Sequence, residues 1–156
     1  MRSTQLINYA AIFVILLLLD QASKLYLIEY LKTVPDGQIT IASFFDLIYS
    51  WNYGISFGMF GGYEYSNILF LILNSCIILY LFYHSYEIID HPQRMSIYLI
   101  ISGALGNLID RILHGAVFDF LHFHLGEYAF PTFNIADMYV SLGACLYLLR
   151  AILVKK

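Results

Sequence analysis

Four long apolar segments dominate this chain and leave it few ways to fold. Each provides about the 20 residues that a helix needs to cross the hydrocarbon core of a bilayer. The chain is 60% hydrophobic and only 12% charged, whereas soluble domains carry about 25% charged residues. We therefore predict an all-α integral membrane protein, a four-transmembrane-helix bundle that forms a single membrane domain over residues 1–156. The expected spans cover residues 6–28, 65–83, 95–113 and 134–154.

Basic residues near the chain ends indicate how these segments cross the membrane. Four spans place both termini on the same side, and an excess of lysine and arginine favours the cytoplasmic side. We therefore predict that both termini are cytoplasmic and that the two long connections, residues 29–64 and 114–133, face outward. The basic residues near the ends are Arg2, Arg150, Lys155 and Lys156.

The two outward connections differ in character. The first contains a turn signal at residues 34–37, because Pro35 sets φ and Gly37 permits a positive φ. The alternating polar and apolar residues 38–41 that follow predict short strands. The second connection is unusually apolar and aromatic, which predicts an interfacial strand or a short amphipathic helix.

Ionisable side chains gather near the expected outer ends of the spans. Asp20 and Lys24 form an i, i+4 pair, which either reaches water at the interface or shapes a site there. We interpret the adjacent Asp110 and Arg111 as an interfacial salt bridge that locks the end of the third span. Other polar residues expected at this depth are Asn52, Asp119 and Asp137.

The apolar segments also contain small or weakly polar residues. Asn67 and Asn74 lie seven residues apart on one face of the second span, and we expect them to hydrogen-bond to neighbouring helices. Gly103 and Gly106 in the third span permit close helix packing. Cys76 and Cys145 lie deep in apolar runs and are interpreted as small buried hydrophobic residues.

Asp119 and Asp137 are the strongest candidates for chemistry. They lie at opposite ends of a connection between antiparallel helices, so they can meet in space. Two carboxylates in a poorly solvated site cannot both ionise, and a pair that shares a proton can activate water against an amide carbonyl and protonate the leaving nitrogen. Asn134 is expected to cap the fourth span, which makes Asp137 its N3 residue. Asp137 taken alone would be interpreted as a helix-capping carboxylate.

Two other functions stay open at this point. His122 and His124 share one face of a strand, and with the two aspartates they would form a metal-dependent hydrolase. Alternatively, the acidic residues would be relay groups of a small transporter, although the sequence has no internal repeat of the kind such folds contain. The net charge of −3 and the lack of a basic cluster beyond the C-terminal pair give no support to a nucleic-acid partner.

Five motifs, taken together and in this order, resemble those of the bacterial lipoprotein signal peptidases (signal peptidase II), a family of membrane aspartyl proteases. The resemblance covers essentially the whole chain. The motifs are DQASK at residues 20–24, WNYGISFG at 51–58, GALGNLIDR at 103–111, GAVFDF at 115–120 and FNIAD at 133–137.

The resemblance implies a site made of two catalytic residues and eight others. Asp119 and Asp137 would be the catalytic pair, and no metal or other cofactor is implied. The His122-x-His124 pattern matches no family role. The residues implied to bind substrate or support the pair are Asp20, Lys24, Asn52, Gly54, Asn107, Arg111, Asn134 and Ala136.

The resemblance also implies a substrate and a location. The family removes the signal peptide from prolipoproteins whose cysteine carries diacylglycerol, cleaving before that cysteine, and it is the target of the cyclic peptide globomycin. The implied protein is a monomer in the bacterial cytoplasmic (inner) membrane, with membrane lipids as partners and its active site near the outer face. The implied architecture adds a small extracytoplasmic β-rich cradle from the first connection and an interfacial helix from the second.

Overall fold

The computed structural model describes residues 2–54 and 66–154, and four long helices lie within these ranges. All four are long and apolar enough to cross a membrane, which confirms the predicted four-span bundle. Residues 55–58 of the glycine-rich motif and the expected start of the second span at residue 65 lie outside the described residues. The helices are α1 (Arg2–Leu31), α2 (Ser66–Glu87), α3 (His91–His114) and α4 (Ile135–Val154).

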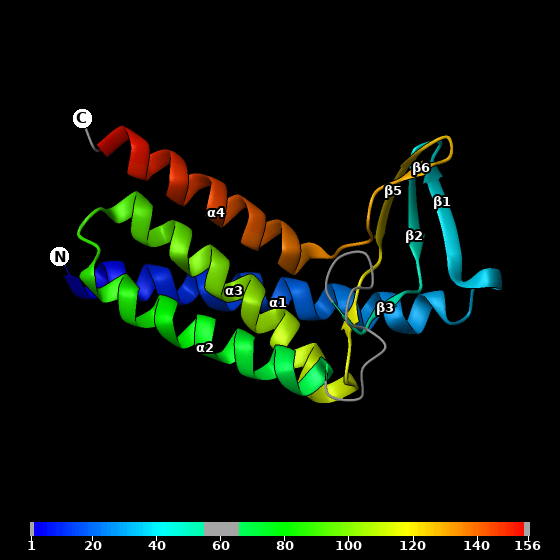
Figure 1. The fold of residues 1–156 in the computed structure, drawn as a ribbon, viewed down its shortest axis with the longest axis horizontal. Coiled ribbons are helices and arrows are strands. Elements are labelled where there is room, and N and C mark those ends of the chain that lie inside the picture. The colour runs from blue at the N-terminus through cyan, green and yellow to red at the C-terminus, as the bar shows by residue number, and fades with distance from the viewer. Residues whose placement is uncertain (1, 55–65, 155–156) are drawn as a thin grey trace.

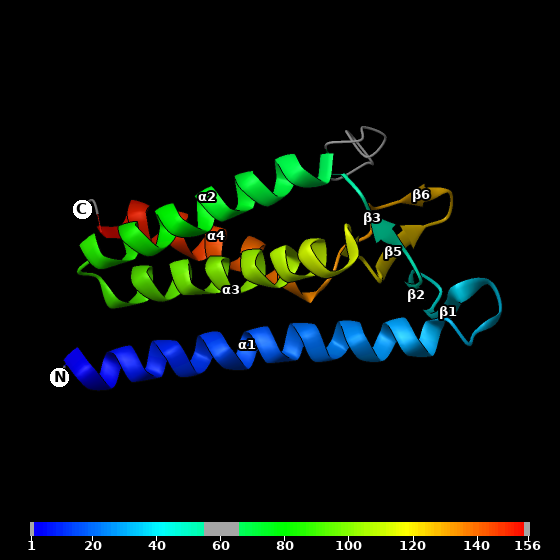
Figure 2. The same ribbon diagram turned by 90° about the horizontal axis from the view of Figure 1, so that it is seen from below.

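Helix α3 is the centre of the bundle, since the other three helices all pack against it. Figure 2 shows α3 between α1 and α2, and Figure 1 shows it between α4 and α2. Two glycines of α3 permit this close approach. A Cβ atom built on Gly103 would collide with the carbonyl oxygen of Ala136, and one on Gly106 would collide with Asp20 Oδ2. The expectation that these glycines permit tight helix packing is confirmed.

Gly103→Ala is expected to destabilise the protein by about 1–3 kcal/mol, the usual cost of overpacking a filled interior. The added methyl group meets backbone next to Asp137, which cannot yield as the tip of a flexible side chain would. Thermal unfolding in detergent measures the loss. Gly126→Asn is the matched control, because nothing lies within 4 Å of its Cβ and asparagine tolerates the φ of +59° there. Equal unfolding temperatures for both variants would contradict the packing role of Gly103.

Two small antiparallel sheets lie at one end of the bundle. The larger has the strand order β1-β2-β5-β6, and the smaller pairs β3 with β4. In Figure 1 they lie at the opposite end from the first turns of α1 and the last turns of α4. The strands are β1 (Gln38–Ala42), β2 (Phe45–Ile48), β3 (Trp51–Asn52), β4 (Val117–Phe118), β5 (Leu121–Leu125) and β6 (Tyr128–Ala129).

The short strands expected in the first connection are confirmed, and the turn before them is a 3-10 turn, η1 (Pro35–Gly37). The interfacial helix implied for the second connection is wrong. Residues 117–129 instead form β4, β5 and β6, and β5 pairs with β2. The physical reason is the two-residue alternation of Leu121–Leu125, which suits a strand that has apolar side chains on one face. The cradle is therefore built from both connections.

The junction between sheets and helices has its own apolar core. Ile28 and Leu31 at the end of α1 pack with Phe118 and Phe120, which flank Asp119. This packing explains why α1 continues three residues beyond the expected end at residue 28. It also fixes the backbone on both sides of Asp119.

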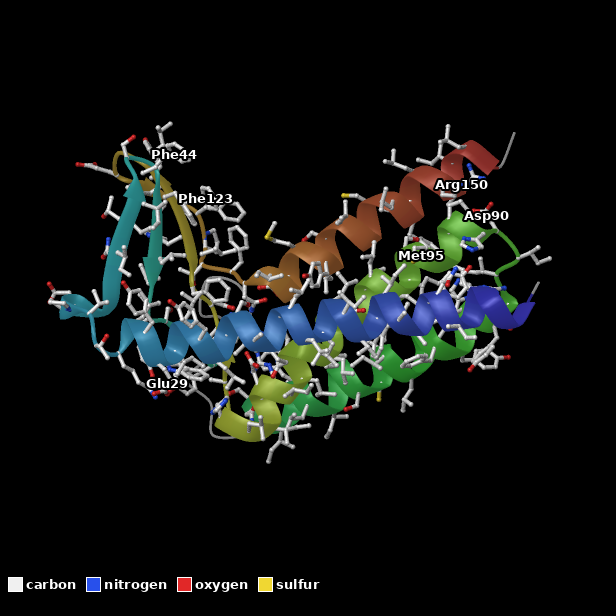
Figure 3. All side chains as sticks on the ribbon, turned by 180° about the vertical axis from the view of Figure 1, so that it is seen from behind. Glu29, Phe44, Asp90, Met95, Phe123 and Arg150 are labelled. Atoms are coloured by element: carbon white, nitrogen blue, oxygen red, sulfur yellow. The ribbon has the colours of Figure 1, made fainter. Side chains whose placement is uncertain are left out.

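The opposite end of the bundle is closed by an ion pair. Asp90 caps the N-terminus of α3 by accepting a hydrogen bond from the Gln93 amide at 3.0 Å. The same carboxylate binds Arg150 of α4 through two bonds of 2.9 and 3.0 Å. Figure 3 labels Asp90 and Arg150 together at this end, with Phe44 and Phe123 at the sheet end. The bundle therefore has two chemically different ends.

The two cysteines correct an expectation. Cys76 and Cys145 are both exposed on the protein surface instead of buried. A span that crosses a membrane can leave apolar residues facing lipid, so an apolar run does not indicate burial within the protein.

Candidate active site

Asp119 lies between β4 and β5 at the junction of sheets and helices, and only 1% of it is exposed. Its backbone N–H donates to the carbonyl oxygen of Ser50 at 3.0 Å. Both carboxylate oxygens accept a hydrogen bond from an amide side chain. Asn52 Nδ2 donates to Oδ2 at 2.9 Å, and Asn134 Nδ2 donates to Oδ1 at 2.7 Å.

Asp137 lies in the first turn of α4 and forms a reciprocal cap with Asn134. The Asp137 backbone N–H donates to Asn134 Oδ1 at 3.0 Å, and the Asn134 N–H donates to Asp137 Oδ2 at 3.1 Å. The other oxygen, Oδ1, accepts from Asn107 Nδ2 at 2.7 Å. The prediction that Asn134 caps this helix is confirmed.

Two asparagines connect the two carboxylates. Besides its bond to Asp119, Asn134 Nδ2 donates to Asn107 Oδ1 at 3.1 Å, and Asn107 in turn donates to Asp137. Asp119 and Asp137 also line one cavity of about 700 Å³. The structure thus brings together the two acids that the sequence singled out, with amide donors orienting each of them.

The cavity lies between α2 and α4, with α3 as its floor. Both polar and apolar side chains line the cavity. The lining residues are Asn52, Gly54, Phe70, Leu73, Asn74, Asn107, Arg111, Val117, Asp119, Phe130, Pro131, Thr132, Phe133, Asp137, Met138, Val140 and Ser141.

The surroundings of Asp119 favour its protonated form. Burial is the main cause, and the nearby Asp137 carboxylate adds to it, so the pKa of the Asp119 carboxyl rises to about 7. The hydrogen bonds from Asn52 and Asn134 oppose this rise, because they stabilise the charged carboxylate. A carboxyl group with a pKa near 7 can both hold and release a proton at neutral pH.

A buried ionic cluster centred on Lys24 lies next to the two carboxylates. The Nζ atom of Lys24 lies 3.0 Å from Asp20 Oδ2 and 3.0 Å from Asp110 Oδ2. Nζ also donates to Asn107 Oδ1 at 3.0 Å, which links the cluster to Asp137. Asp20 is 0% and Lys24 2% exposed. The alternative in which this pair reaches water at the interface is therefore wrong, because the pair is buried inside the protein and contacts Asn107.

The predicted salt bridge between Asp110 and Arg111 is also wrong. Asp110 pairs with Lys24 and accepts from the Phe118 N–H at 3.1 Å. Arg111 Nη2 donates to the carbonyl oxygen of Gly54 at 2.6 Å, and its guanidinium lies 4.6 Å from the centre of the Phe70 ring. The side chains of adjacent helix residues point about 100° apart, so they do not face each other and rarely form an ion pair.

The remaining implied residues hold these groups in place. The Gly54 N–H donates to Asn52 Oδ1 at 3.0 Å, which orients the Asn52 amide toward Asp119. The Ala136 N–H donates to Asp20 Oδ1 at 3.1 Å, which ties the start of α4 to α1. All ten residues implied by the resemblance therefore belong to one connected network.

Gln21 is a member of this network that sequence reasoning missed. Its Nε2 lies within hydrogen-bond distance of Asp20 Oδ2 at 3.0 Å, Asp110 Oδ1 at 3.2 Å and the Gly106 carbonyl oxygen at 3.2 Å. The available signal was an uncharged polar residue inside an apolar span, which is costly unless it is satisfied.

His122 and His124 contact Asp46 of β2. His124 Nε2 lies 3.0 Å and His122 Nδ1 3.8 Å from Asp46 Oδ2. These contacts lower the pKa of Asp46, although the hydrogen bond from Thr40 lowers it more. Within residues 2–54 and 66–154, no three His, Cys, Asp or Glu side chains are placed to hold one metal ion. The histidines therefore give no support to a metal-dependent hydrolase.

Two solved structures are similar to this fold. Each is described as a bacterial membrane enzyme studied by the in meso method, one at 2.3 Å and the other at 1.9 Å resolution. The first superposes with a TM-score of 0.80 at 29% identity, covering 93% of this chain and 87% of its own. The second gives 0.77 at 29% identity, covering 92% of each chain. The fold and the cavity at one end of the bundle define a polytopic membrane enzyme.

Sequence comparison identifies the family. A family model described as signal peptidase (SPase) II matches residues 12–153. The lipoprotein signal peptidase of Rickettsia africae is 43% identical over 136 residues, which are 86% of this chain and 68% of that protein. That of Rickettsia akari is 42% identical over 137 residues, or 87% and 70%. The chain belongs to the signal peptidase II family, and its activity is that of a lipoprotein signal peptidase, a membrane aspartic protease.

Proposed function

We propose that Asp119 and Asp137 are the catalytic pair of this protease. The observation that carries the proposal is their joint position in one cavity, where Asn134 and Asn107 connect them. The pKa of the Asp119 carboxyl, which lies outside the spans, is raised to about 7, and this suits a group that takes up and returns protons. The eight other residues implied by the resemblance support or orient this pair.

The pair would hydrolyse a peptide bond by general acid–base catalysis. One carboxylate accepts a proton from water as the water oxygen attacks the scissile carbonyl carbon. The other carboxyl donates its proton as the C–N bond breaks and the amine leaves. The two groups then exchange the proton between them, so that no proton is gained or lost over the cycle.

The remaining polar groups would orient the substrate. Arg111 Nη1 is buried and has no hydrogen-bond partner in the described part of the chain, and Arg111 lines the cavity. In this proposal Nη1 donates to a carbonyl oxygen of the bound peptide. Asn52 and Asn107 hold the catalytic carboxylates at fixed angles, so that little reorganisation is needed when substrate binds.

The substrate in this proposal is a prolipoprotein whose cysteine carries diacylglycerol, cut immediately before that cysteine. The cavity suits it, because apolar side chains from α2 and α4 line the same cavity as the two carboxylates. The test is to incubate the purified protein in proteoliposomes with a diacylglyceryl-modified precursor. Mass spectrometry should find a product that begins at the lipidated cysteine. A cut elsewhere, or equal cleavage of the unmodified precursor, would contradict the proposal.

The proposed orientation places both termini in the cytoplasm of a bacterium and the cavity near the outer face of the inner membrane. Basic Arg150 at the end away from the sheets supports this orientation. The proposed active form is a monomer. Globomycin, a cyclic peptide, would occupy the same cavity and compete with substrate.

Removing the amide of Asn52 is expected to change the pH profile of cleavage. The Asn52 bond stabilises the charged carboxylate of Asp119. Its loss in Asn52→Ala therefore raises the pKa of Asp119. If cleavage needs the protonated form of this group, kcat/KM of the wild type falls above about pH 7, and the fall in the variant begins at higher pH. A pH series of initial rates measures the shift, and an unchanged upper limb would contradict the assignment.

A further inference from the structure

Two uncharged polar residues from different helices line the cavity. Asn74 comes from α2 and Ser141 from α4, and both line the cavity. Asn67, its neighbour on the same face of α2, donates to the Arg111 carbonyl oxygen at 3.3 Å, as expected from the sequence. Asn74 does not follow that expectation, since among the described residues its side chain makes no hydrogen bond to a neighbouring helix. A polar side chain that lines the cavity and has no protein partner is available to hydrogen-bond a ligand there.

Both residues lie one helical turn farther from the sheets than the catalytic pair. Ser141 follows Asp137 by four residues on α4, which is about 6 Å along the axis. Asn67 lies beside Arg111, and Asn74 is about 10 Å farther along α2. Asn107, which contacts Asp137, is about 6 Å beyond Arg111 on the antiparallel α3. Asn74 is therefore roughly 4 Å deeper than the pair.

The groups around these two residues are apolar. Phe70 and Leu73 flank Asn74 on α2, and Met138 and Val140 flank Ser141 on α4. A ligand that fits here must be mainly hydrocarbon, with an acceptor for an amide N–H or a hydroxyl. Ester carbonyls at the head of acyl chains have this chemistry, because they accept hydrogen bonds and cannot donate them.

The distance also suits an ester. In a diacylglyceryl cysteine, seven bonds separate the cysteine nitrogen from the nearer ester carbonyl carbon, roughly 8 Å when extended. A scissile bond held at Asp119 and Asp137 therefore leaves a link long enough for an ester carbonyl to reach the depth of Asn74 and Ser141, about 4–6 Å away. The backbone carbonyls of a helical signal peptide, in contrast, are mostly bonded within that helix.

We propose that Asn74, assisted by Ser141, donates hydrogen bonds to the ester carbonyls of the substrate's diacylglyceryl group and so selects an ester-linked lipid. This inference rests on the proposed function, because it places the scissile bond at the aspartate pair. Asn74 is a specificity-determining residue, and it takes no part in the proton transfers.

The test compares two synthetic precursors that differ only in the lipid linkage. One carries two ester-linked chains, and the other carries two ether-linked chains of the same length without carbonyl oxygens. We expect the wild type to have a KM about three- to tenfold lower for the ester substrate, the range of a neutral hydrogen bond. In Asn74→Leu most of the difference between the two KM values is lost, and only the smaller part that Ser141 contributes stays, while kcat remains within about twofold of the wild type. Ser141→Ala gives a smaller change in the same direction.

Leu73→Ala is the matched control on the same helix. It changes the shape of the groove without removing a donor, so it should affect the ester and ether substrates equally. Thermal unfolding of each variant shows whether it is folded. If Asn74→Leu does not fold, Ser141→Ala, which removes only one oxygen atom, provides a second variant for the test.

Three outcomes would separate this inference from the proposed function. A wild type that cleaves both substrates with equal KM contradicts the inference and leaves the proposed function standing. An Asn74→Leu variant whose KM rises equally for both substrates shows that Asn74 contacts the peptide or shapes the groove, which also contradicts the inference. A wild type that cleaves neither substrate contradicts the proposed function itself.

Discussion

Replacing Asp119 or Asp137 by asparagine should reduce cleavage of a lipid-modified precursor by about 10³-fold or more, because each change removes an acid–base group. The protein should still fold. Each substituted side chain keeps an oxygen that can accept one of the two hydrogen bonds now made to the carboxylate. A gel-shift assay in proteoliposomes measures the loss, and thermal unfolding of the same preparations shows that the variant is folded.

Asp36→Asn is the matched control for this experiment. Asp36 lies in the turn before β1 with a φ of 60°, and asparagine tolerates that conformation. The Asp36→Asn variant should cleave the precursor at the rate of the wild type. A variant of Asp119 or Asp137 that keeps more than about a tenth of the activity would contradict the proposed pair, because one missing acid–base group costs at least about 10²-fold.

Lys24→Met should cost roughly 3–5 kcal/mol of unfolding free energy, because it leaves two buried carboxylates without their cation. Asp20 and Asp110 both lie 3.0 Å from Nζ, and all three side chains are almost fully buried. Cleavage should fall as well, since Lys24 also holds Asn107, the partner of Asp137. Denaturant unfolding in detergent measures the stability.

A second substitution distinguishes lost charge balance from lost packing. Wild type carries one positive and two negative charges in this cluster, and Lys24→Met leaves two negative charges. Adding Asp110→Asn returns the net charge to that of the wild type, so the double variant should recover part of the lost stability. If the double variant is less stable than Lys24→Met alone, the explanation based on charge is wrong. Lys32→Met is the matched control, because Lys32 forms an exposed ion pair with Glu29 at 2.9 Å and such pairs contribute about 1 kcal/mol or less.

Much of the site was predictable because its residues are unusual where they occur. A carboxylate or lysine inside an apolar segment is expensive, so Asp20, Lys24 and Asp137 are conspicuous in the sequence. The helix cap that Asn134 forms for Asp137 was also predictable, because it depends on residues three apart.

Partner choice among these residues was not predictable from spacing. Lys24 was expected to pair only with Asp20, one turn away, yet it also binds Asp110 and Asn107 on another helix. Arg111 binds Gly54 instead of its neighbour Asp110. The contacts of Lys24 depend on how closely α1 and α3 approach, and the contact of Gly106 with Asp20 permits that approach. The spacing of charged residues in the sequence does not contain this distance.

By itself the sequence determined that the chain crosses a membrane four times, because the length and hydrophobicity of a span are local properties that each segment carries alone. It also determined which acids are candidates for chemistry. Only the tertiary structure decided that strands from both connections share one sheet and that Asp119 and Asp137 line one cavity. Such contacts join residues far apart in the chain, and their energies depend on distances that exist only after the helices have packed.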